Sequence, residues 1–150
     1  MSMEVLVDDA TLLAGLQNKA DRLPEELKML VNTAAFAVDR EVKLAAPVKT
    51  GNLQGATSID NLSDYEKRIF VDEGIAPYAL YVIKGTDPYV IDIYPVNAKA
   101  LYWPGADHPV KHVQVHHPGI KGNDYFQTGV DNAKPAIDSA INEFKSWIME

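Results

Sequence analysis

The four histidines of this chain lie close together in the sequence: His108, His112, His116 and His117. Neutral imidazole is the commonest metal ligand in proteins, so the clustering raises a zinc or nickel site as a hypothesis. On an extended strand, His112 and His116 would lie roughly 13 Å apart on the same side, too far to share one ion. A helix would bring them together, but the flanking prolines and the β-branched valines between them disfavour a helix. Asp107 and Asp124 would complete a site only if the loops fold back. We therefore expect no metal, and solvated or interface histidines.

No other pattern of catalytic residue types is present. The chain has no cysteine, which rules out a disulfide framework, a zinc finger and a cysteine nucleophile. No serine lies in a Gly-x-Ser-x-Gly elbow, and no glycine-rich run has the spacing of a phosphate loop. Carboxylates are numerous but form no motif. We expect no catalytic residues, no cofactor and no enzymatic activity; an enzyme that uses the histidines with a metal is the last-ranked alternative.

The composition is that of a globular protein. The chain has 150 residues, 47% of them hydrophobic and 23% charged, which predicts one compact domain over residues 1–150 with a core of its own. The net charge of −7 makes the average surface repel nucleic acid and anionic membranes. No apolar stretch is long enough to span a bilayer, and the first residues lack the basic and apolar segments of a signal peptide. We expect a cytosolic protein when it is made.

Helical periodicity is strongest in the first third of the chain. Apolar residues recur at spacings of three and four over residues 24–46, with Pro24 at the first helical position and Pro47 ending the pattern. Residues 4–7 could add an edge strand, and a shorter packing helix is expected from Asp8 or Asp9, with Leu12, Leu13 and Leu16 on one face. A C-terminal amphipathic helix is expected with Pro135 near its first turn.

Strand patterns fill the middle of the chain. A turn at Gly51, which is free to adopt positive φ, precedes the first of them. The predicted strands are residues 53–59, 65–72, 89–94, 98–103 and 112–116. Residues 78–84 could form a short helix or a strand, because periodicity does not decide over so few residues. The order of elements predicts an α+β fold, in which a mostly antiparallel sheet packs against the long helix of the N-terminal half and the C-terminal helix.

Aromatic residues are concentrated beside the prolines of the middle segment: Tyr78, Tyr81, Tyr89, Tyr94, Tyr102 and Trp103. Tyrosine and tryptophan are favoured at protein–protein contacts, where an apolar body is buried and a polar tip stays wet. Alternatively, these side chains fill the core face of the sheet. Tyr89, Tyr94, Tyr102 and Trp103 are the candidate interface residues.

Three segments, taken in order, resemble one protein family. The first is Ala46-Pro47-Val48-Lys49-Thr50-Gly51-Asn52-Leu53, similar to Ala-Pro-x-x-Thr-Gly-x-Leu. The second is Tyr78-Ala79-Leu80-Tyr81-Val82-Ile83-Lys84-Gly85-Thr86, similar to Tyr-Ala-x-x-x-Glu-x-Gly-Thr. The third is His117-Pro118-Gly119, followed by Phe126 and a closing helix. Together they resemble the phage tail-component and tail-completion (head–tail joining) proteins, the family that includes the lambda minor tail protein Z. Ile83, Gln54 and Ala56 stand where the family commonly has an acidic residue, Arg and Ser.

The resemblance implies a structural virion protein at the neck or tail of a tailed virus, present in the host cytoplasm during assembly. It implies a homo-oligomeric ring, sixfold or twelvefold, between the head connector or adaptor and the tail tube proteins. DNA would pass through without specific binding, and no membrane would be involved. Residues 85–110 are the candidate contact with neighbouring subunits or the next ring. The alternative is an interaction module of a prophage remnant or a contractile device.

Overall fold

The chain folds as an α+β protein, as the sequence predicts. Its computed structural model describes residues 9–49 and 51–149. The chain divides into two compact units. The helical unit comprises Met1–Pro77 and Tyr125–Glu150, and the arm unit comprises Tyr78–Asp124. The predicted edge strand over residues 4–7, Asp8 and Thr50 lie outside the described residues.

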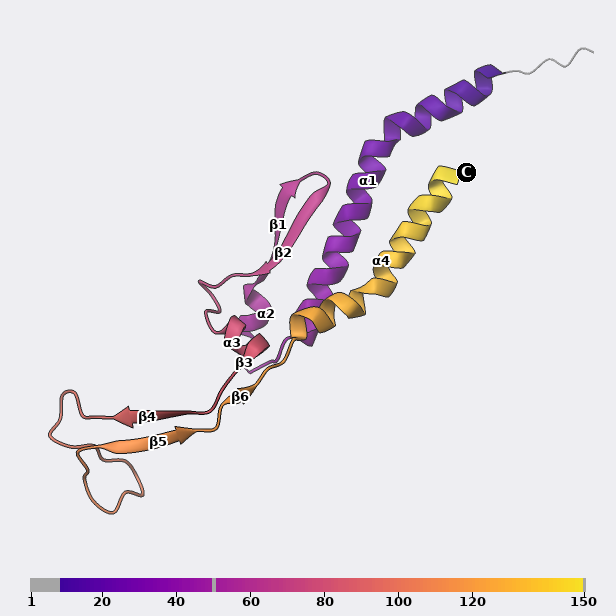
Figure 1. Cartoon of the computed structure of the whole chain (residues 1–150). Helices are drawn as coiled ribbons and strands as arrows, with labels where there is room; N and C mark the ends of the chain where they lie inside the picture. Colours follow the sequence, from indigo (N-terminus) through magenta and orange to yellow (C-terminus); the bar gives the residue numbers. More distant parts are fainter. Residues whose placement is uncertain (1–8, 50, 150) are drawn as a thin grey trace, which may run out of the picture. The chain divides into compact units, whose positions relative to one another are not determined.

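Two long helices dominate the helical unit. They are α1 (Asp9–Ala45) and α4 (Tyr125–Met149), and Figure 1 shows them side by side. The prediction of a separate helix that begins at Pro24 is wrong, because Pro24 lies inside the continuous α1; Pro135 likewise lies inside α4. A proline inside a helix removes one backbone hydrogen bond and bends the helix, but strong helix-forming residues on both sides can maintain it. Figure 1 shows a bend in each of the two helices.

The two helices run antiparallel and pack closely. At one end, an added Cβ on Gly129 would lie 2.4 Å from the Cα of Val42, so only glycine permits this approach. At the other end, Lys19 Nζ donates to the carbonyl oxygen of Ile148 at 2.9 Å, and the Arg22 guanidinium lies 5.5 Å from the ring centroid of Trp147. The buried side chains of α1 and α4 are mostly small: Ala35, Val42, Ala133 and Ala140.

A short helix, α2 (Asn52–Ala56), follows α1. The turn predicted at Gly51 is confirmed, with a φ of 79°. The strand predicted from Leu53 is wrong over its first residues, because Gly55 N–H donates to the Gly51 carbonyl and closes a helical turn. Leu53 and Ala56 share one face of that turn, and both are buried. Gln54 Nε2 donates to the Lys43 carbonyl at 2.8 Å and ties α2 to the end of α1.

Over residues 9–49 and 51–149, the strands form three two-stranded antiparallel sheets rather than one sheet. In the helical unit, β1 (Thr57–Ser63) pairs with β2 (Glu66–Val71). In the arm unit, β3 (Gly85–Thr86) pairs with β6 (Ile120–Lys121), and β4 (Tyr89–Ile93) with β5 (Val113–His117). Within the part of the chain that the structure describes, no helix is both long and apolar enough to cross a membrane.

Two segments of the arm unit differ from a simple strand pattern. Residues 78–84, for which the sequence left a helix and a strand open, form the helix α3 (Ala79–Lys84). The strand predicted over residues 98–103 is wrong, since this segment forms only an isolated bridge between Leu101 and Val110. Pro95 and Pro104 flank it, and proline provides no N–H for a longer ladder.

Candidate interaction surface

The β3–β6 pair brings together two of the segments that carried the family resemblance. Gly85 pairs with Lys121, and Thr86 with Ile120, so the Gly-Thr motif meets the chain directly after His-Pro-Gly. The backbones approach closely at Gly85 and Gly119, which have φ values of 78° and 80°. An added Cβ would lie 2.4 Å from the Ile120 carbonyl oxygen at Gly85 and 2.4 Å from the Thr86 carbonyl oxygen at Gly119. This pair is the base from which the arm extends.

Most of the other motif residues lie at the ends of helices or in the loops beside them. Pro47 is exposed, and Gly51 and Leu53 lie at the start of α2. Ala79 is buried at the start of α3, whereas Tyr78 and Pro118 are exposed. At the start of α4, Phe126 is half-buried while its neighbour Tyr125, which the sequence reading missed, is fully buried. The hydroxyl oxygen of Thr86 is buried without a hydrogen-bond partner in the described chain.

The arm itself is the β4–β5 hairpin with its long connection, residues 94–112. Tyr89 pairs with His117, Ile91 with Val115, and Ile93 with Val113. Because successive side chains of a strand point to opposite faces, these six residues share one face, which we call the apolar face. Asp92, Gln114 and His116 lie on the opposite face. Figure 1 shows β4 and β5 side by side in the arm.

A hollow of about 400 Å³ lies on the apolar face. Its lining residues are apolar or aromatic: Ile93, Leu101, Tyr102, Trp103, Val113 and Val115. The bridge that holds the connection beside the hairpin is made by two backbone hydrogen bonds between Leu101 and Val110, at 2.7 and 3.0 Å. The hollow therefore presents an uncharged surface of the kind that receives apolar side chains.

The four candidate interface residues are exposed rather than buried in a sheet core. The exposed fractions are 46% for Tyr89, 60% for Tyr94, 68% for Tyr102 and 43% for Trp103. Tyr102 and Trp103 line the hollow, whereas Tyr94 stacks with His112 at a centroid separation of 4.7 Å. The sequence reading missed the aliphatic part of this surface. The alternation of valine and isoleucine in the two strands was the signal that could have revealed it.

Histidine side chains make contacts within the arm. His112 Nε2 lies 2.8 Å from the Asp92 carboxylate, to which Gln114 Nε2 also donates at 3.2 Å. These hydrogen bonds, the one from His112 first, hold the pKa of Asp92 below its ordinary value. Tyr89 and His117 stack at 4.8 Å, and the Gly119 N–H donates to His117 Nδ1 at 3.1 Å.

The arrangement gives no metal-ligand geometry. Among the residues that the structure describes, no three His, Cys, Asp or Glu side chains come together in a group that could hold an ion. His112 and His117 lie on opposite faces of the hairpin by strand alternation. Each is instead engaged with a tyrosine ring and a polar group of the arm.

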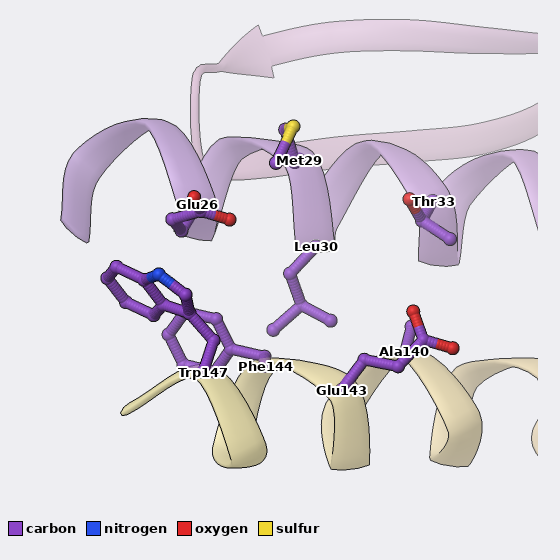
Figure 2. Close-up of a pocket in the computed structure, with 8 residues that line it drawn as sticks. All are labelled: Glu26, Met29, Leu30, Thr33, Ala140, Glu143, Phe144 and Trp147. Carbon is purple, nitrogen blue, oxygen red and sulfur yellow. The ribbon is translucent and has the colours of Figure 1, made fainter. Parts of the chain in front are cut away.

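A second hollow, of about 230 Å³, lies between α1 and α4. Figure 2 shows Leu30 pointing into it and the carboxylates of Glu26 and Glu143 toward its opposite ends. Glu26 forms an ion pair with Arg22 at 2.6 Å, and Glu143 accepts a hydrogen bond from Ser139 at 3.2 Å. Because the carboxylates of Glu26 and Glu143 are separated and have their own partners, they do not form an acid–base pair in this hollow.

Comparison with models of protein families, with curated proteins and with solved structures found no match to this chain. The resemblance carried by the three motifs therefore stays a prediction.

Proposed function

We propose that this chain is a structural virion protein of a tailed virus, a ring-forming head–tail joining or tail-completion component without catalytic activity. The three ordered motifs suggest this class. The observation that supports the assembly role is the exposure of the apolar face of the arm and of the hollow on it.

An exposed two-stranded hairpin with an apolar face is expected to need a partner. An isolated hairpin of two strands is marginally stable in water. Here Tyr89, Ile91, Ile93 and Val115 are each between 38% and 46% exposed. A contiguous apolar surface of this kind marks an interaction site in a folded protein. Covering it would both stabilise the arm and hold two molecules together.

The base of the arm supports the same proposal. Gly85 and Gly119 place β3 and β6 in close backbone contact, and Asn123 N–H donates to the Val82 carbonyl at 2.9 Å beside them. A hairpin whose two strands are fixed at their base keeps its register, so it can present one constant face to another molecule. Such an element suits a contact between subunits of a ring, where each subunit uses two different surfaces.

Electron microscopy of particles from cells that lack this gene tests the proposal. We expect DNA-filled heads beside separate tails of normal or excessive length, and joined particles when the intact gene is supplied again. Joined, infectious particles in the absence of the gene would contradict the proposed role.

A further inference from the structure

The start of α1 carries leucines that are left exposed by the residues that the structure describes. Leu12, Leu13 and Leu16 are 62%, 59% and 56% exposed, although the sequence predicts an ordinary packing helix. Leu16 lies four residues after Leu12 and three after Leu13, so the three leucines form one stripe. The last turn of α4 contacts α1 at Lys19 and Arg22, and Figure 1 shows the first turns of α1 extending beyond α4.

This stripe lies in an uncharged stretch. Residues 10–18 contain no Asp, Glu, Lys or Arg, in a chain of which 23% is charged. An exposed helix surface is normally covered with charged side chains. A helix end that combines three exposed leucines with no charge is therefore suited to a dry contact. We refer to residues 10–18 as the leucine end.

Charge is divided unequally between the two units. The arm unit contains neither Arg nor Glu, and its lysines and aspartates are equal in number: Lys84, Lys99, Lys111, Lys121, Asp87, Asp92, Asp107 and Asp124. Its formal charge is zero, so the net charge of −7 belongs entirely to the helical unit. Two helical units that approach each other repel, whereas a helical unit and an arm unit do not.

We propose that the leucine end of one copy docks on the apolar face of the arm of a second copy, with its leucines at the hollow. Neither the leucine end nor the lining of the hollow has a charged side chain, so no ion is desolvated on contact. An apolar helix stripe laid into an apolar groove is a common mode of recognition. Charge favours this pairing over one between two leucine ends, because the latter would bring two negative helical units together.

The contact joins two different surfaces, so it is heterologous and can repeat from copy to copy around a closed ring. The proposal identifies the two surfaces that would meet in the ring. It rests on the proposed function only in placing that ring in a virus particle. The contact itself does not depend on a virus particle and can be tested separately.

Because the chain has no cysteine, paired cysteine substitutions report the contact cleanly. We expect the double variant Leu16→Cys/Val115→Cys to give a ladder of disulfide-linked dimers, trimers and higher multimers on mild oxidation. The two single variants should give dimers at most, since one cysteine can form one bond. The matched control is Ser146→Cys/Val115→Cys, in which the first cysteine replaces an exposed serine of α4; it should give no ladder.

The experiment is made on the purified full chain and on particles from cells in which the variant gene replaces the intact one. A ladder specific to the Leu16→Cys/Val115→Cys pair in either preparation supports the proposal. Four results would overturn the proposal: dimers only, disulfides closed within one chain only, a ladder of equal strength in the control pair, or no ladder in either preparation. If the ladder forms but particles are normal after gene deletion, the contact is supported and the virion role is rejected. If particles are defective after gene deletion but no ladder forms, the virion role is supported and the contact is rejected.

A charge exchange gives a second test that does not use disulfides. Leu16→Glu and Val115→Lys should each weaken self-association by about tenfold or more, because an isolated charge would enter an apolar contact. The double variant should recover at least part of the loss, since the two charges meet across the interface. Both positions are exposed, so circular dichroism should report unchanged folding. Association unaffected by either single change would argue against the contact.

Discussion

His112 and Asp92 illustrate how a residue that suggests a metal ligand in the sequence can act as a structural contact. The imidazole lies 2.8 Å from the carboxylate across the β4–β5 pair and stacks on Tyr94. Gln114 adds a second hydrogen bond to the same carboxylate. The pair joins the two strands on the face opposite the hollow. It fixes the end of the hairpin from which the long connection departs.

This contact predicts a pH dependence of the arm. The hydrogen bonds lower the pKa of Asp92 from about 3.8, so folding favours the ionised carboxylate. That stabilisation is complete above the ordinary value and is lost as the pH falls through the lowered pKa. In an NMR titration of the Asp92 carboxyl carbon, we expect a midpoint below 3.8, which His112→Ala raises toward the ordinary value.

Asp131 serves as the internal control for this titration. Its pKa is lowered by a hydrogen bond from Lys134, then by one from Gln127, and none of these residues lies in the arm. The His112→Ala substitution should leave it unchanged. Equal titration of Asp92 in the wild type and in His112→Ala would contradict the assigned cause.

At the scale of elements, the antiparallel pair α1 and α4 depends on close approach rather than on large apolar side chains. Val42 and Tyr125 are the largest fully buried side chains described. Most other core positions are alanines, such as Ala35 and Ala133. Small residues allow two helix backbones to come near each other, so packing there tolerates little added volume.

Gly129 gives this packing a direct test. In Gly129→Ala, the new Cβ would meet the backbone of Val42 at 2.4 Å, and the free energy of unfolding should fall by about 2 kcal/mol or more. The matched control is Gly55→Ala in α2, where an added Cβ meets nothing within 4 Å. That variant should be neutral or stabilised by up to about 1 kcal/mol, because alanine is the better helix former. Urea denaturation followed by circular dichroism measures both; equal effects would contradict the close-packing account.

At the scale of the whole molecule, the main feature is the uneven division of charge and apolar surface. The helical unit carries the net charge of −7, and the arm unit is neutral and holds all four histidines. The apolar face lies in the neutral arm unit, and the leucine end lies in the charged helical unit but contains no charged residue itself. This division is consistent with a chain that is kept apart from copies of itself except through selected contacts.

The same division predicts weak interaction with nucleic acid. In fluorescence anisotropy with duplex DNA at physiological salt, the purified chain should show no saturable binding, because phosphate contacts need a basic surface. Neither unit has a positive formal charge. Replacing Glu25 and Asp21, two exposed acids of α1, with lysine should increase binding. Tight, salt-dependent binding by the unmodified chain would contradict the expectation that DNA passes such a protein without being held.

The sequence by itself determined the α+β class, the two helical regions and three of the strands. Residues 65–72, 89–94 and 112–116 were found within one residue of β2, β4 and β5, because alternating and β-branched residues constrain local backbone geometry. The turn at Gly51 was also found, since it needs positive φ. These features depend on neighbours in the chain, which the sequence displays.

Only the tertiary structure decided how the elements meet and which surfaces remain exposed. Leu53 starts a helical turn rather than a strand because burial of Leu53 and Ala56 on one face outweighs weak local preference over five residues. Pro24 stands inside α1, and the described strands divide among three sheets. The exposure of the leucine end and of the apolar face could not be predicted, since periodicity shows that a face is apolar but not what covers it. Coverage is set by residues distant in the sequence, and in this chain we propose that a second copy supplies it.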